Sequence, residues 1–288
     1  MIIWLASYPK SGNTWIRSFI AAILFSEDGN VGFENLSKIG QYPLISHFEN
    51  FIDKEEIIKP ENAEKLFKFM IPTQDLLNLD SKTKFYKTHF LNCKVGEYNF
   101  TNKINTLGVI HIVRDPRNVI TSLKNHFSKK TIEDACNFIL DSDRWLVEKK
   151  TDNNFIKDNS FPTFISSWKN HYNFWKKTNT NYLLIKYEKL LEEPKEEFNK
   201  IVIYIEKLLN IKIEKKKVEK AIESSSFKNL RLLEDQDKFD EFVKDKKNSK
   251  VRFFYMGHEN NWKKILREDI KKKIEENFNE EMKELNYL

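Results

Sequence analysis

The fold class is decided by the opening stretch of the chain, Ile2-Ile3-Trp4-Leu5-Ala6-Ser7-Tyr8-Pro9-Lys10-Ser11-Gly12-Asn13-Thr14-Trp15. Residues 2–7 form a short apolar run, which predicts a buried strand. Residues 8–13 are turn formers, and apolar side chains then recur at helical spacing as far as Phe25, which predicts a helix. A buried strand that leads through a turn into a helix is typical of proteins that alternate strands with helices.

The same alternation continues along the chain. Further strands are expected at residues 84–88, 107–113 and 182–186. Further helices are expected after Pro116, through residues 198–209 and through residues 270–285. The pattern predicts an α/β fold, P-loop-like and three-layered, in which helices flank a central, mostly parallel sheet.

The chain of 288 residues is expected to form a single domain over residues 1–288, because no internal repeat and no low-complexity linker divides it. Residues 27–80 look like a mostly helical insertion. Residues 234–250 are dense in charge, and two interpretations stay open for them, a mobile lid and a solvated connection between elements.

Composition limits the classes of function. Hydrophobic residues make up 40% of the chain, so disorder of the whole chain is excluded. Lys and Arg number 49 against 43 Asp and Glu, and the lysine runs have glutamates nearby, which is typical of solvated helix faces and not of a nucleic-acid stripe. Neither a membrane span nor a signal peptide is expected, so we predict a cytoplasmic protein. Two cysteines are too few for a disulfide scaffold or a four-cysteine zinc site.

The loop before the first helix is a candidate anion site. A helix N-terminus offers backbone N–H groups and the positive end of the helix dipole. Gly12 would let a ligand approach the backbone, Lys10 would add a charge, and short polar side chains come from Ser11, Asn13 and Thr14. The order of residues does not match a Walker A loop, since the lysine precedes the single glycine. The alternative is an ordinary turn in which Ser or Asn caps the helix.

The end of the third predicted strand is a second candidate anion site. Only seven arginines occur, and two of them, Arg114 and Arg117, follow this strand directly. Ligands of open parallel sheets bind beyond the carboxyl ends of the strands, so Arg114 and Ser122 would lie on the same side as Lys10. A guanidinium group can bind a phosphate through paired hydrogen bonds. The alternative is a salt bridge between Arg114 and an acid such as Asp115.

The end of the second predicted strand carries Lys87 and His89. A histidine in this position can act as a general base near neutral pH. The alternative is a structural histidine, because the chain has six histidines and a single one carries little weight. His111 lies inside an apolar strand and is expected in the core. No pair of His or Cys has the spacing of metal ligands, so no metal site is predicted.

Together these segments resemble the sulfotransferases that use 3′-phosphoadenosine 5′-phosphosulfate (PAPS). Residues 8–15 are similar to that family's 5′-phosphosulfate loop, and residues 113–122 to its 3′-phosphate motif. Residues 87–89 match the segment that carries the family's catalytic histidine. The resemblance extends to about residue 265. It implies further contacts to the adenine and 3′-phosphate from Tyr187, Ser225, Phe227 and Gly257.

The chain also departs from the family pattern. Tyr255-Met256 stands where the family usually has Arg-Lys, which removes two expected contacts to the 3′-phosphate. Arg252 or a nearby lysine is the candidate substitute. Asn260-Asn261 replaces the family's Gly-Asp pair, and residues 263–268 do not match its dimerisation pattern, so the oligomeric state stays open.

The resemblance implies transfer of the sulfuryl group of PAPS to an acceptor hydroxyl or amine, without a metal, leaving adenosine 3′,5′-diphosphate. His89 would accept the proton, while Lys10 and Lys87 would balance charge around the sulfuryl group. Ser122 would bind the 3′-phosphate and hold Lys10 away until an acceptor arrives. For Trp15, two roles stay open, contact with the adenine and packing against the sheet.

Three other functions are considered. A nucleotide kinase of the P-loop type would share the fold but needs a Walker A loop and Mg²⁺. A non-catalytic family member could still hold nucleotide. Tyr255-Met256 favours this alternative, and the presence of Lys10, Lys87 and His89 together argues against it. A nucleic-acid binder is supported only by the net charge of +6.

The acceptor cannot be read from the sequence, and a small molecule, a lipid and a glycan all stay open. Seven aromatic residues could either line an apolar acceptor pocket or belong to the core. They are Phe33, Phe48, Phe51, Phe90, Phe127, Phe138 and Trp145.

Overall fold

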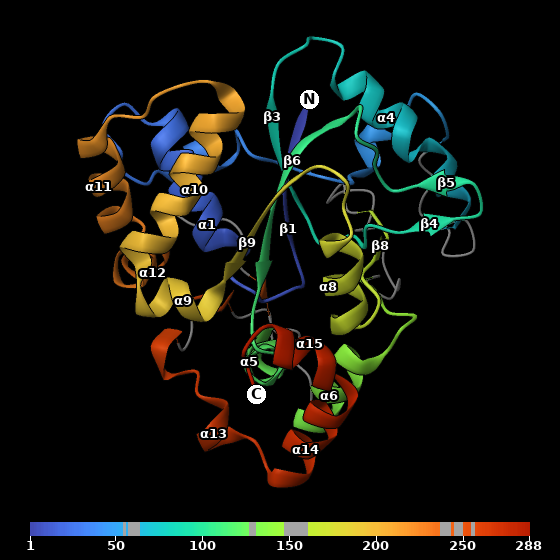
Figure 1. The fold of residues 1–288 in the computed structure, drawn as a ribbon, viewed down its shortest axis with the longest axis vertical. Coiled ribbons are helices and arrows are strands. Elements are labelled where there is room, and N and C mark those ends of the chain that lie inside the picture. Colours follow the sequence, from blue (N-terminus) through green and yellow to red (C-terminus); the bar gives the residue numbers. More distant parts are fainter. Residues whose placement is uncertain are drawn as a thin grey trace. The chain divides into compact units, whose positions relative to one another are not determined.

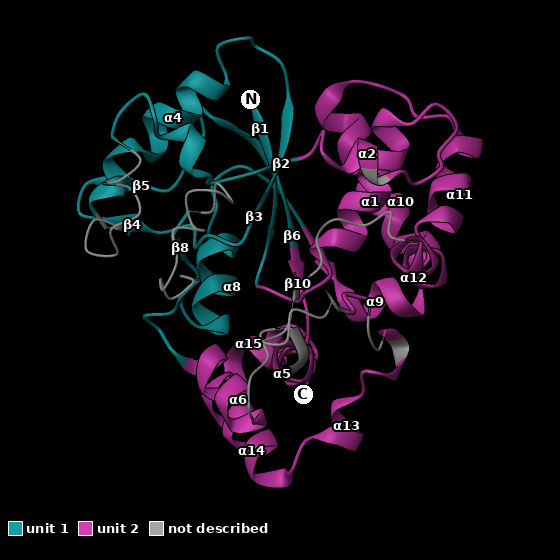
Figure 2. Cartoon of the chain, turned by 180° about the vertical axis from the view of Figure 1, so that it is seen from behind, with its two compact units in different colours: residues 1–8, 40–111, 141–183 teal, residues 9–39, 112–140, 184–288 magenta. Residues whose placement is uncertain are grey.

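The computed structural model describes residues 1–53, 56, 64–126, 131–146, 161–236, 243–244, 250–254 and 257–288. The chain forms two compact units, which Figure 2 shows in different colours. Unit 1 comprises residues 1–8, 40–111 and 141–183, and unit 2 comprises residues 9–39, 112–140 and 184–288. Each unit is therefore assembled from three segments that are distant in the sequence.

The main sheet has five strands in the order β2-β3-β1-β6-β9. They are β1 (Ile2–Ser7), β2 (Gly40–Gln41), β3 (Lys84–Thr88), β6 (Thr106–Val113) and β9 (Asn181–Lys186). Strand β1 pairs in parallel with β3, from Ile2 opposite Lys84 to Ala6 opposite Thr88, and β2 pairs in parallel with β3. All of β1 is buried, as expected for a strand inside a parallel sheet. The predicted α/β fold with a parallel sheet flanked by helices is confirmed.

Unit 1 is built around Trp4, a fully buried residue in the middle of β1. The Trp4 ring lies 5.4 Å from Tyr42, 5.4 Å from Phe100 and 6.5 Å from Trp175, measured between ring centroids. Its Nε1 donates a hydrogen bond to Thr106 Oγ1 over 2.9 Å, so the one polar atom of the Trp4 ring has a partner.

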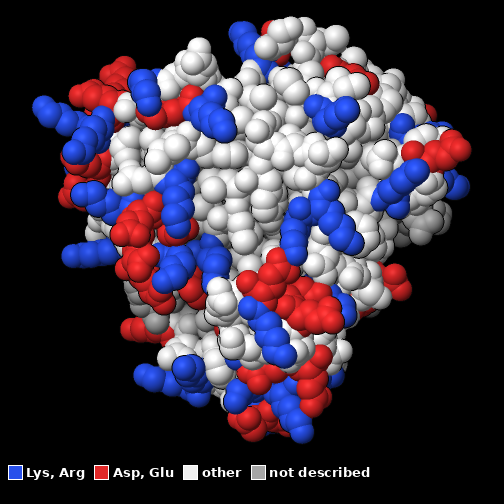
Figure 3. Space-filling model, in the orientation of Figure 1, with Lys and Arg blue, Asp and Glu red and all other residues white. Residues whose placement is uncertain are grey.

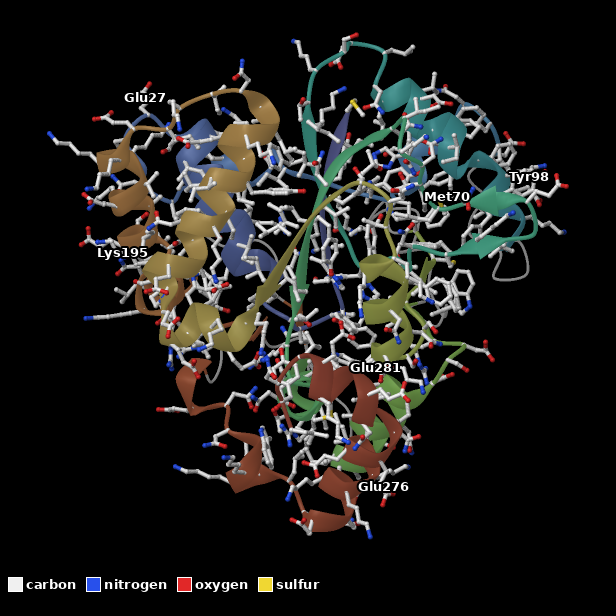
Figure 4. All side chains as sticks on the ribbon, viewed as in Figure 1. Glu27, Met70, Tyr98, Lys195, Glu276 and Glu281 are labelled. Carbon is white, nitrogen blue, oxygen red and sulfur yellow. The ribbon has the colours of Figure 1, made fainter. Side chains whose placement is uncertain are left out.

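The remaining elements of unit 1 are short. The helices are α4 (Met70–Leu77), α8 (Trp168–Lys176) and two 3-10 turns at Ile45–His47 and Glu64–Phe69. The strands are β4 (Lys94–Val95) with β5 (Tyr98–Asn99), and β7 (Trp145–Leu146) with β8 (Thr163–Phe164). Met70, labelled in Figure 4, is fully buried and joins the aromatic core, as does Cys93.

Helices dominate unit 2, which is magenta in Figure 2, and Figure 1 follows them along the chain. One group contains α1 (Asn13–Phe25), α2 (Phe33–Leu36), α9 (Tyr187–Glu192), α10 (Pro194–Leu209), α11 (Lys215–Ser224) and α12 (Phe227–Asp235). The other contains α5 (Pro116–His126), α6 (Ile132–Leu140), α13 (Trp262–Ile265), α14 (Glu268–Asn277) and α15 (Asn279–Glu284). Helix α1 is buried along most of its length, and α6 buries Cys136 completely.

The helix expected over residues 270–285 is in fact two helices, α14 and α15. Phe278, at the junction, has φ −119 and ψ 23, which lies outside the helical region. Its side chain is nevertheless buried together with Ile274 and Met282, so the apolar spacing continues across the break. Because apolar residues of both helices are buried on a common face, the helical pattern in the sequence is longer than either helix.

Residues 27–80 contain more than helix. They include α2, the edge strand β2, both 3-10 turns and α4. The charge-dense stretch 234–250 lies mostly outside the described residues, apart from the end of α12 and β10 (Val243–Lys244), which pairs with β11 (Lys250–Val251). The lid and the solvated connection therefore both stay predictions.

Three of the seven aromatic residues considered for an acceptor pocket are buried in a unit. The buried ones are Phe48, Phe90 and Phe138. Phe51 and Trp145 are half-buried. Phe127 and the side chain of Phe33 lie outside the part of the chain that is described.

On the face drawn in Figure 3, basic and acidic side chains lie interspersed. This mixture gives the described residues of that face no continuous basic stripe for a nucleic acid. None of the described helices is both long and apolar enough to cross a membrane.

Candidate active site

In unit 2, the loop between Tyr8 and α1 adopts a left-handed backbone at two residues. Lys10 has φ 67, and Gly12 has φ 98. Gly12 is also the N-cap of α1, so no capping side chain covers the N–H groups of the first helical turn. A left-handed conformation at a lysine costs about 1–2 kcal/mol, and such strain gathers at ligand sites. The loop therefore has the backbone shape of an anion cradle.

Two polar atoms, one in this loop and one in the first turn of α1, are buried without a hydrogen-bond partner among the described residues. They are Ser11 Oγ and Trp15 Nε1. A buried polar group without a partner costs about 1–3 kcal/mol, so both atoms fit a site in which a bound ligand supplies the partner. The Trp15 ring itself packs edge-on against Tyr187 and Phe198, with ring centroids 5.8 Å apart in both pairs.

Gly12 is required by its surroundings as well as by its backbone. A Cβ atom at this position would lie 2.5 Å from Cδ2 of the Tyr187 ring. The loop and the first residue of α9 therefore touch at a point where no side chain fits.

Arg114 joins the end of β6 to the loop. One of its terminal nitrogens donates a hydrogen bond to the backbone oxygen of Lys10 over 2.9 Å, and its guanidinium carbon lies 4.1 Å from the centre of the Tyr187 ring. Asp115, the acid considered as its salt-bridge partner, pairs with Arg117 through several hydrogen bonds of 2.7–3.1 Å. The two predicted anion segments, loop and strand end, thus meet at Lys10 and Arg114.

The side chain of Lys10 lies over the ring of Phe253, with Nζ 4.1 Å from the ring centre. The backbone N–H groups of Phe253 and Phe254 donate to the Glu234 carboxylate over 2.5 and 3.0 Å. Arg252 is exposed and pairs with Asp235 over 2.5 Å. Tyr255 and Met256, which stand where an Arg-Lys pair was expected, lie outside the described residues.

The other predicted nucleotide contacts lie on α5, α12 and the turn before α13. Gly257 has φ 50, and a Cβ there would lie 2.6 Å from Cε1 of Phe227, so these two residues touch. Ser225 is fully buried just before α12. Ser122 is half-buried on α5.

In unit 1, His89 follows β3 directly, and Lys87 is the fourth residue of that strand. The His89 Nδ1 atom lies 2.7 Å from the backbone oxygen of Ser7 and 3.2 Å from Ser7 Oγ. A carbonyl oxygen can only accept a hydrogen bond, so the neutral ring carries its proton on Nδ1, and the lone pair is on Nε2. The ring is half-buried, as is Lys87.

Sequence reasoning did not find the network around Arg117. This buried side chain donates to Glu275 Oε1 over 2.5 Å and to the backbone oxygen of Tyr287 over 2.6 Å, in addition to Asp115. The ring of Trp262 lies 3.9 Å from its guanidinium carbon. A second arginine beside Arg114 was the only signal, since the partners of Arg117 other than Asp115 are more than 140 residues away in the sequence.

Glu188 extends this network to α9. Its carboxylate accepts hydrogen bonds from the backbone N–H of Asp115 over 3.0 Å and from the hydroxyl of Tyr287 over 2.9 Å. Burial raises the pKa of the Glu188 carboxyl above its ordinary value. The C-terminal segment is thus connected to the stretch that follows β6. Among the described residues, no group of His, Cys, Asp and Glu is arranged to hold a metal ion.

A family model of the sulfotransferase domain matches residues 2–286. The chain belongs to this sulfotransferase family. The luciferin sulfotransferase of Photinus pyralis is 27% identical to it over 286 residues, which cover 95% of this chain and 70% of that protein. Cytosolic sulfotransferase 6 of Arabidopsis thaliana is 23% identical over 277 residues, which cover 95% and 76%. The resemblance found in the sequence is therefore confirmed, and the chain is an enzyme of this family, which sets the nucleotide kinase aside.

Two solved structures show the same fold. A mouse sulfotransferase complexed with PAP has a TM-score of 0.58 and 18% identity, covering 97% of this chain and 83% of that one. Retinol dehydratase in a complex with retinol and PAP has a TM-score of 0.60 and 16% identity, covering 98% and 81%.

Proposed function

We propose that this sulfotransferase moves the sulfuryl group of PAPS to a hydroxyl or amine of a small acceptor, with His89 as the general base. The observation that carries this proposal is the 2.7 Å contact from His89 Nδ1 to the Ser7 carbonyl. That contact leaves the lone pair of the ring on Nε2, which is what a base needs.

The residues of unit 2 fit the donor. Bound PAPS supplies an activated sulfuryl group, and its phosphates need donors and cations. Ser11 Oγ is a buried polar atom without a partner among the described residues, and Lys10 and Arg114 supply positive charge beside it. Trp15, Asn13 and Thr14 begin α1, whose N-terminus favours an anion. The two solved relatives in fold contain PAP, which supports the same nucleotide here.

Other residues are expected to contact the 3′-phosphate and the adenosine of the donor. Arg114 and Ser122 would hold the 3′-phosphate, with the exposed Arg252 as an additional cation. Tyr187, Ser225, Phe227 and Gly257 would contact the adenosine.

The reaction transfers the sulfuryl group from the donor to the acceptor and moves one proton from the acceptor to His89. A bond forms between the acceptor oxygen or nitrogen and sulfur, and the bond between sulfur and the bridging phosphate oxygen breaks. His89 Nε2 takes the acceptor proton. Lys10 stabilises the negative charge that develops on the departing nucleotide, and Lys87 helps to balance charge on the sulfuryl group. Adenosine 3′,5′-diphosphate (PAP) leaves as the second product.

The names of the relatives favour a small-molecule acceptor over a lipid or a glycan. Luciferin sulfotransferase and an amine sulfotransferase of Oryctolagus cuniculus, 21% identical over 287 residues, are named for small acceptors. Several relatives are named cytosolic sulfotransferases, which supports the cytoplasmic location expected from the sequence.

The test is a turnover assay with sulfur-labelled PAPS and a panel of phenols, alcohols, amines and glycans. We expect His89→Ala to lower kcat by about 10²- to 10⁴-fold, because a general base contributes that much. Its affinity for PAP, measured by thermal shift without metal, should match that of the wild type, because the expected nucleotide contacts come from other residues.

A loss of kcat below about tenfold would rule out His89 as the base. The donor assignment would be contradicted if PAP did not raise the Tm of the wild type and ATP with Mg²⁺ did not raise it either.

A further inference from the structure

Helix α8 of unit 1 holds the two residues that follow β3 by their backbone oxygens. His171 Nε2 lies 3.2 Å from the oxygen of His89, and Trp175 Nε1 lies 2.9 Å from the oxygen of Phe90. His171 and Trp175 are four residues apart, so they lie on one face of the helix. Ser167 caps the helix by accepting a hydrogen bond from the backbone N–H of Asn170 over 3.3 Å.

His171 can only be a donor in this contact. The oxygen of His89 is a carbonyl, so Nε2 of His171 must carry the proton. The side chain is almost completely buried, with Tyr8 edge-on at 5.6 Å and His111 at 5.9 Å between ring centroids. Burial lowers the pKa of His171 to about 3, so the ring stays neutral at physiological pH and offers a single N–H.

His89 is therefore held at both ends by different elements. The ring is fixed through Nδ1 to the carbonyl of Ser7, the last residue of β1. The backbone is fixed through its oxygen to His171 on α8. The segment beyond is fixed as well, because the N–H of Leu91 donates to the oxygen of Phe164 over 2.7 Å.

We propose that His171 is a positioning residue that fixes the ring and the tautomer of His89 for proton transfer. This inference rests on the proposed function of His89. Without the donor on α8, the peptide after His89 can rotate, and the ring then moves away from the carbonyl of Ser7. A displacement of about 1 Å at a reacting group can lower turnover by about 10²-fold.

The decisive comparison uses two amides that differ by one methylene. His171→Gln places an N–H₂ group near the position of Nε2 and can still donate to the oxygen of His89. His171→Asn places the same group near Nδ1, where it falls short. We expect His171→Gln to retain most of kcat, and His171→Asn to lose about 10- to 100-fold in kcat with unchanged affinity for PAP.

A matched control is His111→Gln. His111 is fully buried beside His171, and its Nδ1 lies 2.7 Å from the hydroxyl of Tyr182, a contact that a glutamine does not reproduce. We expect this variant to be destabilised but to turn over like the wild type. Equal losses of kcat in His111→Gln and His171→Asn would overturn the proposal, as would equal activity of His171→Gln and His171→Asn.

A spectroscopic readout separates this inference from the proposed function. In ¹⁵N-histidine NMR, with His89→Gln used to assign the ring, the wild type and His171→Gln should show the Nδ1–H tautomer of His89. His171→Asn should shift the signal toward the Nε2–H form that free imidazole prefers. A loss of the Nδ1–H form without any effect of His89→Ala on turnover would remove the base role but keep the positioning contact. An unchanged tautomer in His171→Asn would overturn the positioning contact itself.

Discussion

At the scale of single residues, the nucleotide loop depends on backbone shape more than on side chains. Gly12 has a φ of 98, and a Cβ at this position would lie 2.5 Å from an atom of the Tyr187 ring. Both the backbone conformation and this contact therefore require glycine. Sequence reasoning gave Gly12 this role from its place between a strand and a helix. It did not find Tyr187 as the contact, because the two residues are 175 positions apart.

Replacing Gly12 by alanine should therefore have two effects. We expect a lower Tm and at least a tenfold weaker affinity for PAP, because the backbone strain of about 1–2 kcal/mol is joined by a clash with Tyr187. Gly96→Ala is the matched control, since Gly96 also has positive φ, at 58, but nothing lies within 4 Å of the added Cβ. Thermal unfolding and calorimetric titration with PAP would measure both. Equal affinity in the two variants would contradict a role for this loop in binding.

The histidine of the candidate site was predictable only in part. Its place at a strand end indicated a base, and the resemblance supported it. Its tautomer depends on Ser7, which is 82 residues away in the sequence, and its backbone contact depends on His171, which is a further 82 residues away from it. No local pattern carries that information.

At the scale of elements, the C-terminal helices stabilise the stretch that follows β6. Arg117 at the start of α5 contacts Glu275 on α14 and the backbone of Tyr287. The sequence predicted α5 and the helical pattern of α14 and α15 from apolar spacing. It could not predict the break at Phe278 or the two-residue strand β2, because both are too short to change a periodic pattern.

Removing the Tyr287 hydroxyl tests this connection. In Tyr287→Phe, the buried carboxylate of Glu188 loses a hydrogen bond, and we expect the free energy of unfolding to fall by about 1–3 kcal/mol. Tyr98→Phe is the control, because Tyr98 projects from β5 at the outer edge of unit 1 and is 47% exposed (Figure 4). It should change stability by less than about 0.5 kcal/mol. Urea unfolding would measure both, and equal values would show that the Glu188 contact does not contribute.

At the scale of the whole molecule, each compact unit is made of three distant segments, which the sequence did not indicate. The alternation of strands and helices was predictable, because buried strands and amphipathic helices leave local patterns. The partition into units depends on which segments pack together, and the sequence of a single chain does not record those contacts.

Stability should fall in mild acid because buried histidines are neutral in the folded state. Burial lowers the pKa of His171 to about 3, and that of His111 well below its ordinary value. At a pH that lies between the folded pKa of such a histidine and its unfolded pKa of about 6.5, the unfolded state binds more protons than the folded state. Acidification therefore favours unfolding. From pH 6.5 to 5, His171 alone should remove about 1.6 kcal/mol, and His111 acts in the same direction.

Urea unfolding at several pH values would measure this loss. His171→Gln should reduce the pH dependence by the share of one histidine, since glutamine does not titrate. An unchanged slope in this variant would show that His171 is already protonated in the folded state, or that unfolding does not expose it.

The two cysteines give one last consequence. Cys93 lies in the aromatic core of unit 1, Cys136 is enclosed by unit 2, and burial raises the pKa of both thiols, that of Cys93 to about 12. A thiol-labelling reagent can then reach each sulfur only when the surrounding unit opens. Mass spectrometry of the labelled peptides would follow the opening of each unit separately, with probes that the natural sequence already provides.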